Sequence, residues 1–392
     1  MFIQLTILIS LGILCFAYIA YPIIIWSVCK ILPRQRERDE ELNDLPRVSL
    51  IVAAWNEKPW LQSKISNCLA LDYPEELLQL IFVTDGSDDG SPEFLSKYRR
   101  ILLFHNSERK GKSAAINRVM QFVDTPITVF TDANTFLHPD SIRQLVKHFA
   151  HPKIGCVSGE KRVQRLDADS GIAQGESTYW KYESHLKRLD GQLYSVTGAA
   201  GELLAIRTNL FERIPENTIL DDLRISLQVL RSGYRISYEP RAYAIESASQ
   251  SIQEEMKRKI RICSGGFQLM PFLVYFLNPL SFPIFSIQLF SRRIMRWTLA
   301  PLSLLALLVL LPYAAWKWTG VYLVLAVLQT LFYLLALWGW KDRKRKRKSR
   351  FYILPLYFTI MHTAVFIGFK DFILGKSSAL WSKSERQQFS NL

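Results

Sequence analysis

Two adjacent carboxylates and one dense basic segment are the parts of this 392-residue chain that could do acid–base and phosphate chemistry. Asp221 and Asp222 open a predicted helix, Leu223–Ser232, which Gly233 closes. Acidic residues at a helix start commonly act as capping and dipole residues, but beside a polar sheet edge such a pair could instead supply a general base. The basic segment Lys257–Arg261 could anchor on anionic lipid or clamp a phosphate.

A loop of small residues lies before the two carboxylates in the chain. The segment Val196–Arg207 contains Thr197-Gly198-Ala199-Ala200-Gly201 and then feeds a predicted strand. Small side chains let a bulky ligand approach the backbone closely. A tight connection to the strand would explain the same composition, so the loop by itself is compatible with either role.

Polar and ionisable groups also follow four short apolar segments that predict strands. The predicted strands are Val48–Ala54, Leu78–Thr84, Ile101–His105 and Pro126–Thr131, with a fifth at Ile154–Ser158. The groups after the first four include Trp55-Asn56-Glu57, Asp85-Gly86-Ser87, Arg109-Lys110-Gly111-Lys112 and Asp132-Ala133-Asn134. Helical periodicity lies between the strands, over Trp60–Leu71, Pro92–Arg100, Ser113–Val123 and Pro139–Phe149. This alternation predicts an α/β fold with a mostly parallel sheet covered on both faces, in which a ligand lies beyond the carboxyl ends of the strands.

Turn chemistry, a calcium loop and a P-loop are the alternatives for these strand ends. Asp-Gly-Ser runs are common in ordinary turns. The calcium loop is excluded because Ser96 stands where a bidentate glutamate is required. Gly111-Lys112-Ser113 before a helix is similar to a P-loop, but the required earlier glycine is Asn106. A membrane-tethered NTPase therefore remains only a distant alternative.

The net charge of +14 is confined to three basic clusters that border long apolar runs. They are Lys257–Arg261 with +4, Arg292–Arg296 with +3 and Lys341–Arg350 with +7, so the rest of the chain is neutral. This distribution is typical of segments next to a membrane and not of a nucleic-acid groove. We expect a membrane protein whose partner is the lipid bilayer, with no nucleic acid.

Four uncharged segments are long enough to cross the roughly 30 Å of a bilayer's hydrocarbon core. They are Phe2–Cys29, Trp297–Trp316, Trp318–Trp340 and Phe351–Phe369. Pro271, Pro279 and Pro283 interrupt another uncharged run, which predicts short interfacial or re-entrant helices. The predicted organisation is an N-terminal transmembrane helix (1–29), a catalytic domain (30–261), interfacial or re-entrant amphipathic helices (262–296), C-terminal transmembrane helices (297–370) and a tail (371–392).

The basic residues after the first apolar segment predict the topology. Lys30, Arg34, Arg36 and Arg38 place the catalytic domain in the cytoplasm of a multi-pass inner or plasma membrane protein. Four full spans would leave the tail outside the cytoplasm, whereas the tail's net charge of +2 favours a cytoplasmic position. A break at Pro355 would resolve this conflict by making the last apolar segment re-entrant. The five cysteines are scattered without metal-like spacing, which predicts free thiols.

Taken together, the motifs over residues 45–265 resemble those of the membrane-bound family 2 glycosyltransferases, whose catalytic domain has the GT-A fold. That family includes poly-N-acetylglucosamine, hyaluronan, chitooligosaccharide and cellulose synthases. The resemblance implies a Rossmann-like GT-A domain, a UDP-sugar donor and a polysaccharide acceptor. It also makes UDP-N-acetylglucosamine the expected sugar donor and is compatible with coupled export and accessory export subunits.

The resemblance further implies a role for each motif. The nucleotide-binding residues would be Ala54, Trp55, Asn56, Glu57, Asp85, Lys110, Lys112, Asp132 and Arg261. The acceptor-binding residues would be Thr197, Gly198, Ala199, Ala200 and Gly201. Asp222 would be the catalytic base beside Asp221, Arg258 and Arg261 would face the diphosphate, and Asp132 and Asn134 would hold Mg²⁺ or Mn²⁺.

Two positions depart from the family pattern. Asn134 stands where the DxD motif has its second acid, which weakens metal binding or requires another donor. Ile262 replaces the tryptophan that packs on the acceptor sugar, and Arg258 replaces a glutamine. A non-processive transferase that acts on a lipid-linked acceptor therefore remains an alternative to a polysaccharide synthase. A non-catalytic sugar-nucleotide-binding subunit is a more distant one.

The implied reaction is an inverting sugar transfer. Asp222 would take the proton of the acceptor hydroxyl as that hydroxyl attacks the anomeric carbon. Arg261 and one of Lys110 or Lys112 would support the departing diphosphate together with the metal. An α-linked UDP-sugar would then give a β-linkage.

Overall fold

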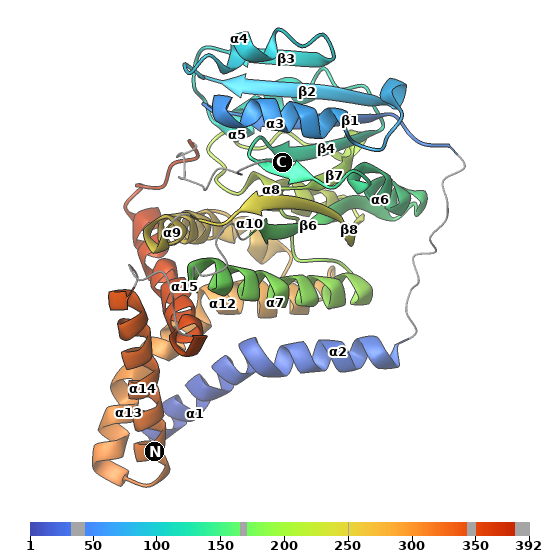
Figure 1. Ribbon diagram of the computed structural model, residues 1–392. Coiled ribbons are helices and arrows are strands. Elements are labelled where there is room, and N and C mark those ends of the chain that lie inside the picture. The colour runs from blue at the N-terminus through green and yellow to red at the C-terminus, as the bar shows by residue number, and fades with distance from the viewer. Residues whose placement is uncertain (33–43, 165–170, 250, 343–349, 381–392) are drawn as a thin grey trace.

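An eight-stranded sheet crosses the upper part of the molecule in the computed structural model, which describes residues 1–32, 44–164, 171–249, 251–342 and 350–380 (Figure 1). Its strand order is β3-β2-β1-β4-β7-β6-β8-β5. The strands are β1 (Val48–Ala54), β2 (Leu78–Asp85), β3 (Ile101–Asn106), β4 (Ile127–Asp132), β5 (Thr135–Leu137), β6 (Ile154–Gln164), β7 (Leu204–Arg207) and β8 (Arg235–Ser247). The pairs β1–β2, β2–β3, β1–β4 and β6–β8 are parallel, and β4–β7, β6–β7 and β5–β8 are antiparallel. The predicted α/β fold with a mostly parallel sheet is confirmed.

The central strand β1 shows why this sheet is covered on both faces. All seven of its residues are buried, and alternate side chains of a strand point to opposite faces. Leu50 and Val52 pack with one helix-covered core, whereas Ile51 and Ala53 pack with the other. The helices that contribute to these cores include α3 (Lys58–Leu69), α4 (Ser91–Leu95), α5 (Lys112–Met120), α6 (Ser141–Lys147) and α8 (Asp221–Arg231).

The helix α4 is shorter than the segment 92–100 that its periodicity predicts. It ends at Leu95, and backbone hydrogen bonds from Tyr98 to Leu95 and from Ile101 to Tyr98 form turns that lead into β3. The difference lies away from the strand ends that carry the polar motifs.

Four helical segments are long and apolar enough to cross a membrane. They are Phe2–Ile31, Leu299–Trp318, Val321–Lys341 and Phe351–Ile373. The first consists of α1 (Phe2–Cys15), a π-helical turn η1 (Phe16–Ala20) and α2 (Tyr21–Ile31). α1 packs against α13 (Leu299–Trp318), while α2 is inclined to α1 and lies beneath α7 (Gly171–Leu193) (Figure 1).

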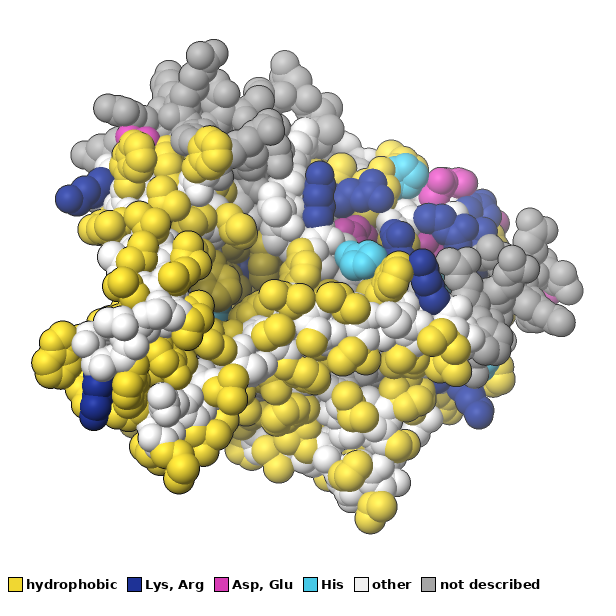
Figure 2. All heavy atoms as spheres, turned by 90° about the horizontal axis from the view of Figure 1, so that it is seen from below, with side chains coloured by type: hydrophobic (Ala, Val, Ile, Leu, Met, Phe, Trp, Pro, Cys, Tyr) yellow, Lys and Arg dark blue, Asp and Glu magenta, His cyan; other side chains and the backbone are white. Residues whose placement is uncertain are grey.

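Apolar side chains dominate the outer surface of these segments. α14 (Val321–Lys341) exposes Leu323, Val324, Leu328 and Leu331. Seen from below, hydrophobic side chains cover much of the molecule, and most of the charged side chains visible there lie toward the upper right, with a few isolated ones on the left (Figure 2). Exposed apolar area of this extent suits a hydrocarbon environment.

The helix α9 (Ile252–Gln268) joins the catalytic domain to the segments after it. The side chain of Ser251 caps it by accepting a hydrogen bond from the backbone N–H of Glu254 at 3.2 Å. The helix continues through residues 261 and 262, so the domain border predicted there lies within one helix. The short helices predicted next are α10 (Met270–Tyr275) and α11 (Pro283–Leu289), followed by the π-helical turn η5 (Phe290–Ile294) and α12 (Met295–Trp297).

The last helix, α15 (Arg350–Ile373), is continuous through Pro355, so the predicted break at this proline does not occur. Near its end, Gly368 allows close packing, since a Cβ there would be 2.8 Å from Cβ of Cys263 on α9. Beyond α15, the hydroxyls of Ser377 and Ser264 form a hydrogen bond. The first tail residues thus lie beside α9. Three predicted features lie partly outside the described residues. They are the basic residues after the first apolar segment, three of which fall in 33–43, the basic cluster at 343–349 and the tail at 381–392.

Candidate active site

The ends of β1 and β2 are fastened together by Trp55 and Asn56. The indole N–H of Trp55 donates a hydrogen bond to the carbonyl of Gly86 at 3.2 Å, and the guanidinium of Arg109 lies 3.5 Å from the centre of the indole ring. Asn56 has a φ of +54°, a left-handed conformation that asparagine tolerates better than most residues. Its side-chain amide donates to Asp88 at 2.7 Å. These contacts present a stacked indole and guanidinium at the edge of the sheet.

Asp85 at the end of β2 shapes the next turn. It is fully buried, and its Oδ2 accepts hydrogen bonds from the backbone N–H groups of Lys110 at 2.8 Å and Gly111 at 2.6 Å. Its Oδ1 lies 3.4 Å from Nη1 of Arg118. Asp85 therefore holds the turn that brings the following Lys112 to the site.

Lys112 links the sheet edge to Asp221, the neighbour of the predicted catalytic base Asp222. Its Nζ lies 2.7 Å from Oδ1 of Asp132 and 3.4 Å from Oδ2 of Asp221. Burial alone would lower the pKa of Lys112, but these two carboxylates outweigh it and raise the pKa above its usual value. The side chain is consequently a permanent positive charge between β4 and α8.

Asp222 lies at the start of α8 beside the small-residue loop. A Cβ on Gly201 would be 3.2 Å from Oδ2 of Asp222, so a larger residue there would crowd this carboxylate. Burial, and then the charge of Asp221, raise the pKa of Asp222 to about 6. A carboxyl group with such a pKa is largely ionised at neutral pH and still basic enough to accept a proton.

The small-residue loop is fixed against α8 and β6. The backbone N–H of Ala199 donates to Oγ of Ser226, and that of Ala200 donates to Oγ of Ser158, both at 3.2 Å. Gly198 has a φ of +126°, and a Cβ there would be 2.4 Å from Leu223. These contacts hold the loop with its backbone beside Asp222.

Arg258 and Arg261, both predicted to face a diphosphate, have different surroundings. Nη1 of Arg258 lies 3.0 Å from Oε1 of Glu176 and 3.7 Å from Oε2 of Glu255. Arg261 lines the pocket described below, its Nε is buried, and no ion pair or hydrogen bond holds it among the described residues. Arg261 is therefore the more available of the two cations.

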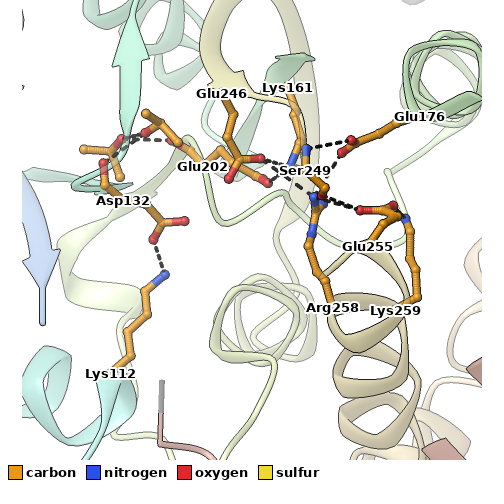
Figure 3. A network of polar contacts seen from close by, with 12 residues as sticks. Lys112, Asp132, Lys161, Glu176, Glu202, Glu246, Ser249, Glu255, Arg258 and Lys259 are labelled. Carbon is orange, nitrogen blue, oxygen red and sulfur yellow. Dashed lines mark hydrogen bonds and ion pairs between the residues drawn. The ribbon is translucent and has the colours of Figure 1, made fainter. Parts of the chain in front are cut away.

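Arg258 belongs to a group of buried charges that we call the inner charge network. Its members are Lys161, Glu176, Glu202, Glu246, Glu255, Arg258 and Lys259 (Figure 3). Ser249 and Tyr357 both donate hydrogen bonds to Glu255, at 2.8 and 2.9 Å. Burial alone would raise the pKa of Glu255, but Lys259 and Arg258 lower it to about 2. The network ties β6, β8, α7, α9 and α15 together, and its carboxylates are satisfied within the protein.

One pocket of about 440 Å³ brings most of the predicted site residues together. Those that line it are Trp55, Glu57, Lys112, Asp132, Asn134, Ala199, Ala200, Gly201, Asp221, Asp222, Arg258 and Arg261. The predicted residues that do not line it are Ala54, Asn56, Asp85, Lys110, Thr197 and Gly198. The second group shapes the turns around the pocket, as Asp85 and Gly198 illustrate.

The donor set at Asp132 and Asn134 fits a divalent cation shared with a substrate. Among the described residues no group of three or more His, Cys, Asp or Glu side chains could hold a metal alone. Mg²⁺ commonly takes only one or two carboxylates from the protein and completes its shell with water and substrate phosphates. The carboxylate of Asp132 and the amide oxygen of Asn134 match that requirement and leave the remaining positions to a diphosphate.

Several pocket residues are not predicted from the sequence. Trp180 and Lys187 come from α7, Arg293 from η5 and Trp297 from α12. The basic cluster that contains Arg293 predicts only charge beside a membrane span. Which of its side chains turns toward the pocket depends on how η5 packs against α7.

The beginning of the tail also reaches the sheet edge. The carbonyl oxygen of Ala379 lies 3.3 Å from the position of a Cβ on Gly111, and Leu380 is also within van der Waals distance of it. Gly111 has a φ of +97°, so a larger residue there would be strained as well as crowded. The segment after α15 therefore packs on the turn that Asp85 holds.

Comparisons with known proteins agree with this geometry. Residues 49–214 match the family model for glycosyl transferase family 2. The poly-beta-1,6-N-acetyl-D-glucosamine synthase of Staphylococcus aureus (strain COL) is 24% identical over 242 residues, which are 60% of this chain and 58% of that protein. The synthase of the same name from Staphylococcus epidermidis is 24% identical over 230 residues, covering 57% of this chain and 55% of the relative. The matched region thus spans a little over half the length of these curated relatives.

A solved structure shares the fold over nearly the whole chain. The mannosyltransferase PcManGT from Pyrobaculum calidifontis, in complex with GDP-Man and Mn²⁺, superposes with a TM-score of 0.72 at 21% identity and covers 95% of this chain and 100% of its own. The NTPase and the non-catalytic subunit considered from the sequence are not supported. Residues 49–214 thus match a glycosyl transferase family 2 domain, within a chain that shares the fold of this solved mannosyltransferase.

Proposed function

We propose that this enzyme transfers a sugar from a UDP-sugar to an acceptor hydroxyl with inversion at the anomeric carbon. The observation that supports it best is the pocket itself. Lys112 and Asp132 stand at the sheet edge, where a nucleotide diphosphate would bind, and Asp222 stands beside the backbone of Gly201 in the same pocket. Donor and acceptor chemistry therefore meet within one cavity.

The residues of the chain would divide the reaction between them. Asp222 takes the proton from the acceptor hydroxyl, whose oxygen forms the new bond to the anomeric carbon, while the bond from that carbon to the UDP oxygen breaks and UDP leaves with the electron pair. Lys112 and Arg261 are the cations placed to stabilise the departing diphosphate. A divalent ion held by Asp132 and Asn134 would neutralise phosphate charge when bound. Mg²⁺ and Mn²⁺ both suit this oxygen donor set.

The sugar and the polymer are proposed from the relatives. The staphylococcal proteins are named as synthases of a β-1,6-linked N-acetylglucosamine polymer. We infer that N-acetylglucosamine is the sugar transferred here and that a growing polysaccharide with β-linkages is the acceptor. Coupled export and accessory export subunits belong to the same proposal.

We also propose that the chain is a multi-pass protein of the inner or plasma membrane with its catalytic domain in the cytoplasm. The four long apolar helices support membrane insertion. Lys30 at the end of α2, whose Nζ lies 3.8 Å from the centre of the Trp26 ring, supports a cytoplasmic position for the domain that begins after this helix. UDP-sugars are cytoplasmic metabolites, which agrees with this orientation.

A lipid-linked acceptor used without processive elongation is the second candidate. Ile262 lines the pocket where the family pattern has an acceptor-stacking tryptophan. Trp297 and Met361, from segments next to or within the apolar helices, line the same pocket. The acceptor end of the pocket is therefore built partly by membrane-associated segments.

The test is a screen of the purified full-length protein against UDP-sugars with Mg²⁺ or Mn²⁺. UDP release and product length are measured together. A long polymer from UDP-N-acetylglucosamine supports the first candidate, and addition of a single sugar supports the second. Absence of UDP release with every UDP-sugar would refute the proposed donor class.

A further inference from the structure

Three arginines on η5 and α12 face two carboxylates of α7. Arg292 pairs with Glu183 at 2.8 Å and with Asp190 at 3.0 Å, and Arg296 pairs with Glu183 at 2.6 Å. Burial alone would raise the pKa of Glu183, but Arg292 and Arg296 outweigh it and lower the pKa to about 2. Both carboxylates are thus already committed to Arg292 and Arg296.

Arg293 is the third member of this group, and it has no ion pair or hydrogen bond within the part of the chain that the structure describes. Its guanidinium lines the active-site pocket, and its Nη2 lies 3.4 Å from the position of a Cβ on Gly198. The guanidinium carbon lies 5.7 Å from the centre of the Trp297 ring. Burial lowers the pKa of Arg293, although an arginine stays charged at neutral pH.

Arg293 is only partly exposed, so its guanidinium loses part of its hydration, and no carboxylate of the described residues lies within ion-pair distance to compensate for that loss. Such a charge is often retained because a ligand completes it. A guanidinium offers two parallel N–H donors that match a phosphate, and this pairing is stronger than a neutral hydrogen bond. The position of Arg293 therefore indicates an anion in the pocket.

Arg293 would hold this anion beside the small-residue loop. Lys112 and Arg261 serve the nucleotide side, whereas Arg293 borders the loop that contains Gly198 and belongs to a segment that leads directly into α13. Lys187 of α7, another buried cation, lines the same pocket. A phosphate bound there would share the pocket with Asp222 and lie beside the segment that leads to α13.

We propose that Arg293 binds a phosphate carried by the acceptor, so that the acceptor is a sugar linked to a lipid through a phosphate or diphosphate. The sugar hydroxyl of that acceptor meets Asp222 and reacts by the inverting transfer proposed for this enzyme, and the phosphate is not consumed. The inference rests on the proposed transfer from a UDP-sugar but not on a polysaccharide being the acceptor. It makes Arg293 a residue that selects the acceptor.

The experiment compares two acceptors that differ only in phosphate. Full-length protein is kept in dodecyl maltoside, which carries no phosphate, and supplied with either N-acetylglucosaminyl diphospho-undecaprenol or octyl N-acetylglucosaminide. Arg293→Gln and Arg293→Lys are measured beside Arg213→Gln, a control whose arginine is exposed and paired only with Glu216 at 2.9 Å. Thermal unfolding checks that each variant is folded.

For Arg293→Gln we expect the KM of the diphospho-lipid to rise by roughly tenfold or more, as for loss of a charge-assisted phosphate contact. The KM values of octyl N-acetylglucosaminide and of the UDP-sugar should stay within about twofold of wild type, because neither carries the phosphate that Arg293 binds. Arg293→Lys should recover part of the loss, and Arg213→Gln should show none. An equal rise for both acceptors, a rise confined to the UDP-sugar, or no rise at all would overturn the proposal.

Binding of the diphospho-lipid without any donor separates this inference from the proposed function. If wild type binds it more tightly than Arg293→Gln but releases no UDP from any UDP-sugar, the phosphate site stands and the proposed reaction fails. If UDP release and transfer to octyl N-acetylglucosaminide proceed while diphospho-lipid binding is equal in both proteins, the reaction stands and the phosphate site fails.

Discussion

Two groups of charged side chains lie next to each other in this enzyme and differ in how completely they are paired. The inner charge network buries three cations among four carboxylates and satisfies them within the protein. The active-site group is made of Lys112, Asp132, Asp221 and Asp222 and lines the pocket, which part of the network also borders. It differs in that Asp222 has no ion pair among the described residues and keeps a raised pKa. The pairing of each group decides its role: the closed network holds elements together, and the open group is available to a substrate.

The largest difference between the two groups is expected when the carboxylate of Asp222, the proposed base, is neutralised. Asp222→Asn keeps the shape of the side chain but cannot accept the proton, so we expect the rate of transfer to fall by about 10² to 10⁴. Binding of UDP should be unchanged, since Asp222 faces the acceptor side. Steady-state rates and UDP titration of the same preparation make the test, and near-normal transfer with unchanged UDP binding would remove Asp222 from the role of base.

A change in the inner charge network should act on stability instead. Arg258→Gln leaves Glu176 and Glu255 buried without their guanidinium, and loss of one partner of a buried pair costs about 3–5 kcal/mol. We expect a clear loss of unfolding free energy in denaturant titrations and little change in UDP affinity of the folded fraction. A variant of normal stability that binds UDP poorly would instead assign Arg258 to the diphosphate, as the sequence predicted.

Arg261→Gln is the matched control for Arg258→Gln, because both arginines lie on α9 and we expect the opposite pattern of effects. Since Arg261 lines the pocket without an ion pair among the described residues, its loss should weaken binding of the UDP-sugar by roughly tenfold and leave stability nearly unchanged. Isothermal titration with UDP and thermal unfolding are the two measurements. Equal effects of the two arginine substitutions on both measurements would erase the distinction between the regions.

A smaller effect is expected from restoring the second acid of the metal motif. Asn134→Asp adds a charged oxygen donor beside Asp132, so half-maximal activation should need roughly three- to tenfold less Mn²⁺. Titration of Mn²⁺ against UDP release measures this change, and direct Mn²⁺ binding by paramagnetic resonance provides a readout independent of turnover. An unchanged Mn²⁺ requirement by both methods would place the cation elsewhere.

The sequence predicted the open group better than the closed one, and the reason is physical. Asp132 and the turn before Lys112 follow buried strands, and parallel strands bring their carboxyl ends to one edge whatever the loops contain. The nearest partner of Arg258, in contrast, is Glu176 of α7, 82 residues earlier in the chain, and only packing brings it there. Arg293 could not be singled out for the same reason, because three neighbouring arginines look alike until α7 neutralises two of them.

The long apolar helices show the same limit. Hydrophobic length identified all four long apolar helices, since a span is a local property of the sequence. The contact of residues after α15 with Gly111 depends on how α15 packs along α9 and has no local signature. Long-range packing, not composition, determines where the residues that follow α15 lie.

The pH dependence of transfer tests the account most directly, because it reports whether a carboxyl group with the raised pKa of Asp222 must be ionised. Burial and Asp221 raise this pKa to about 6, so Asp222 is protonated and inactive below that pH and ionised above it. We predict that kcat/KM measured from pH 5 to pH 8 rises through a limb near pH 6, and that Asp221→Asn moves the limb to lower pH by removing the neighbouring negative charge. A rate that is flat over this range, or a limb that stays in place in Asp221→Asn, would contradict the assignment of Asp222 as the base in an open carboxylate pair.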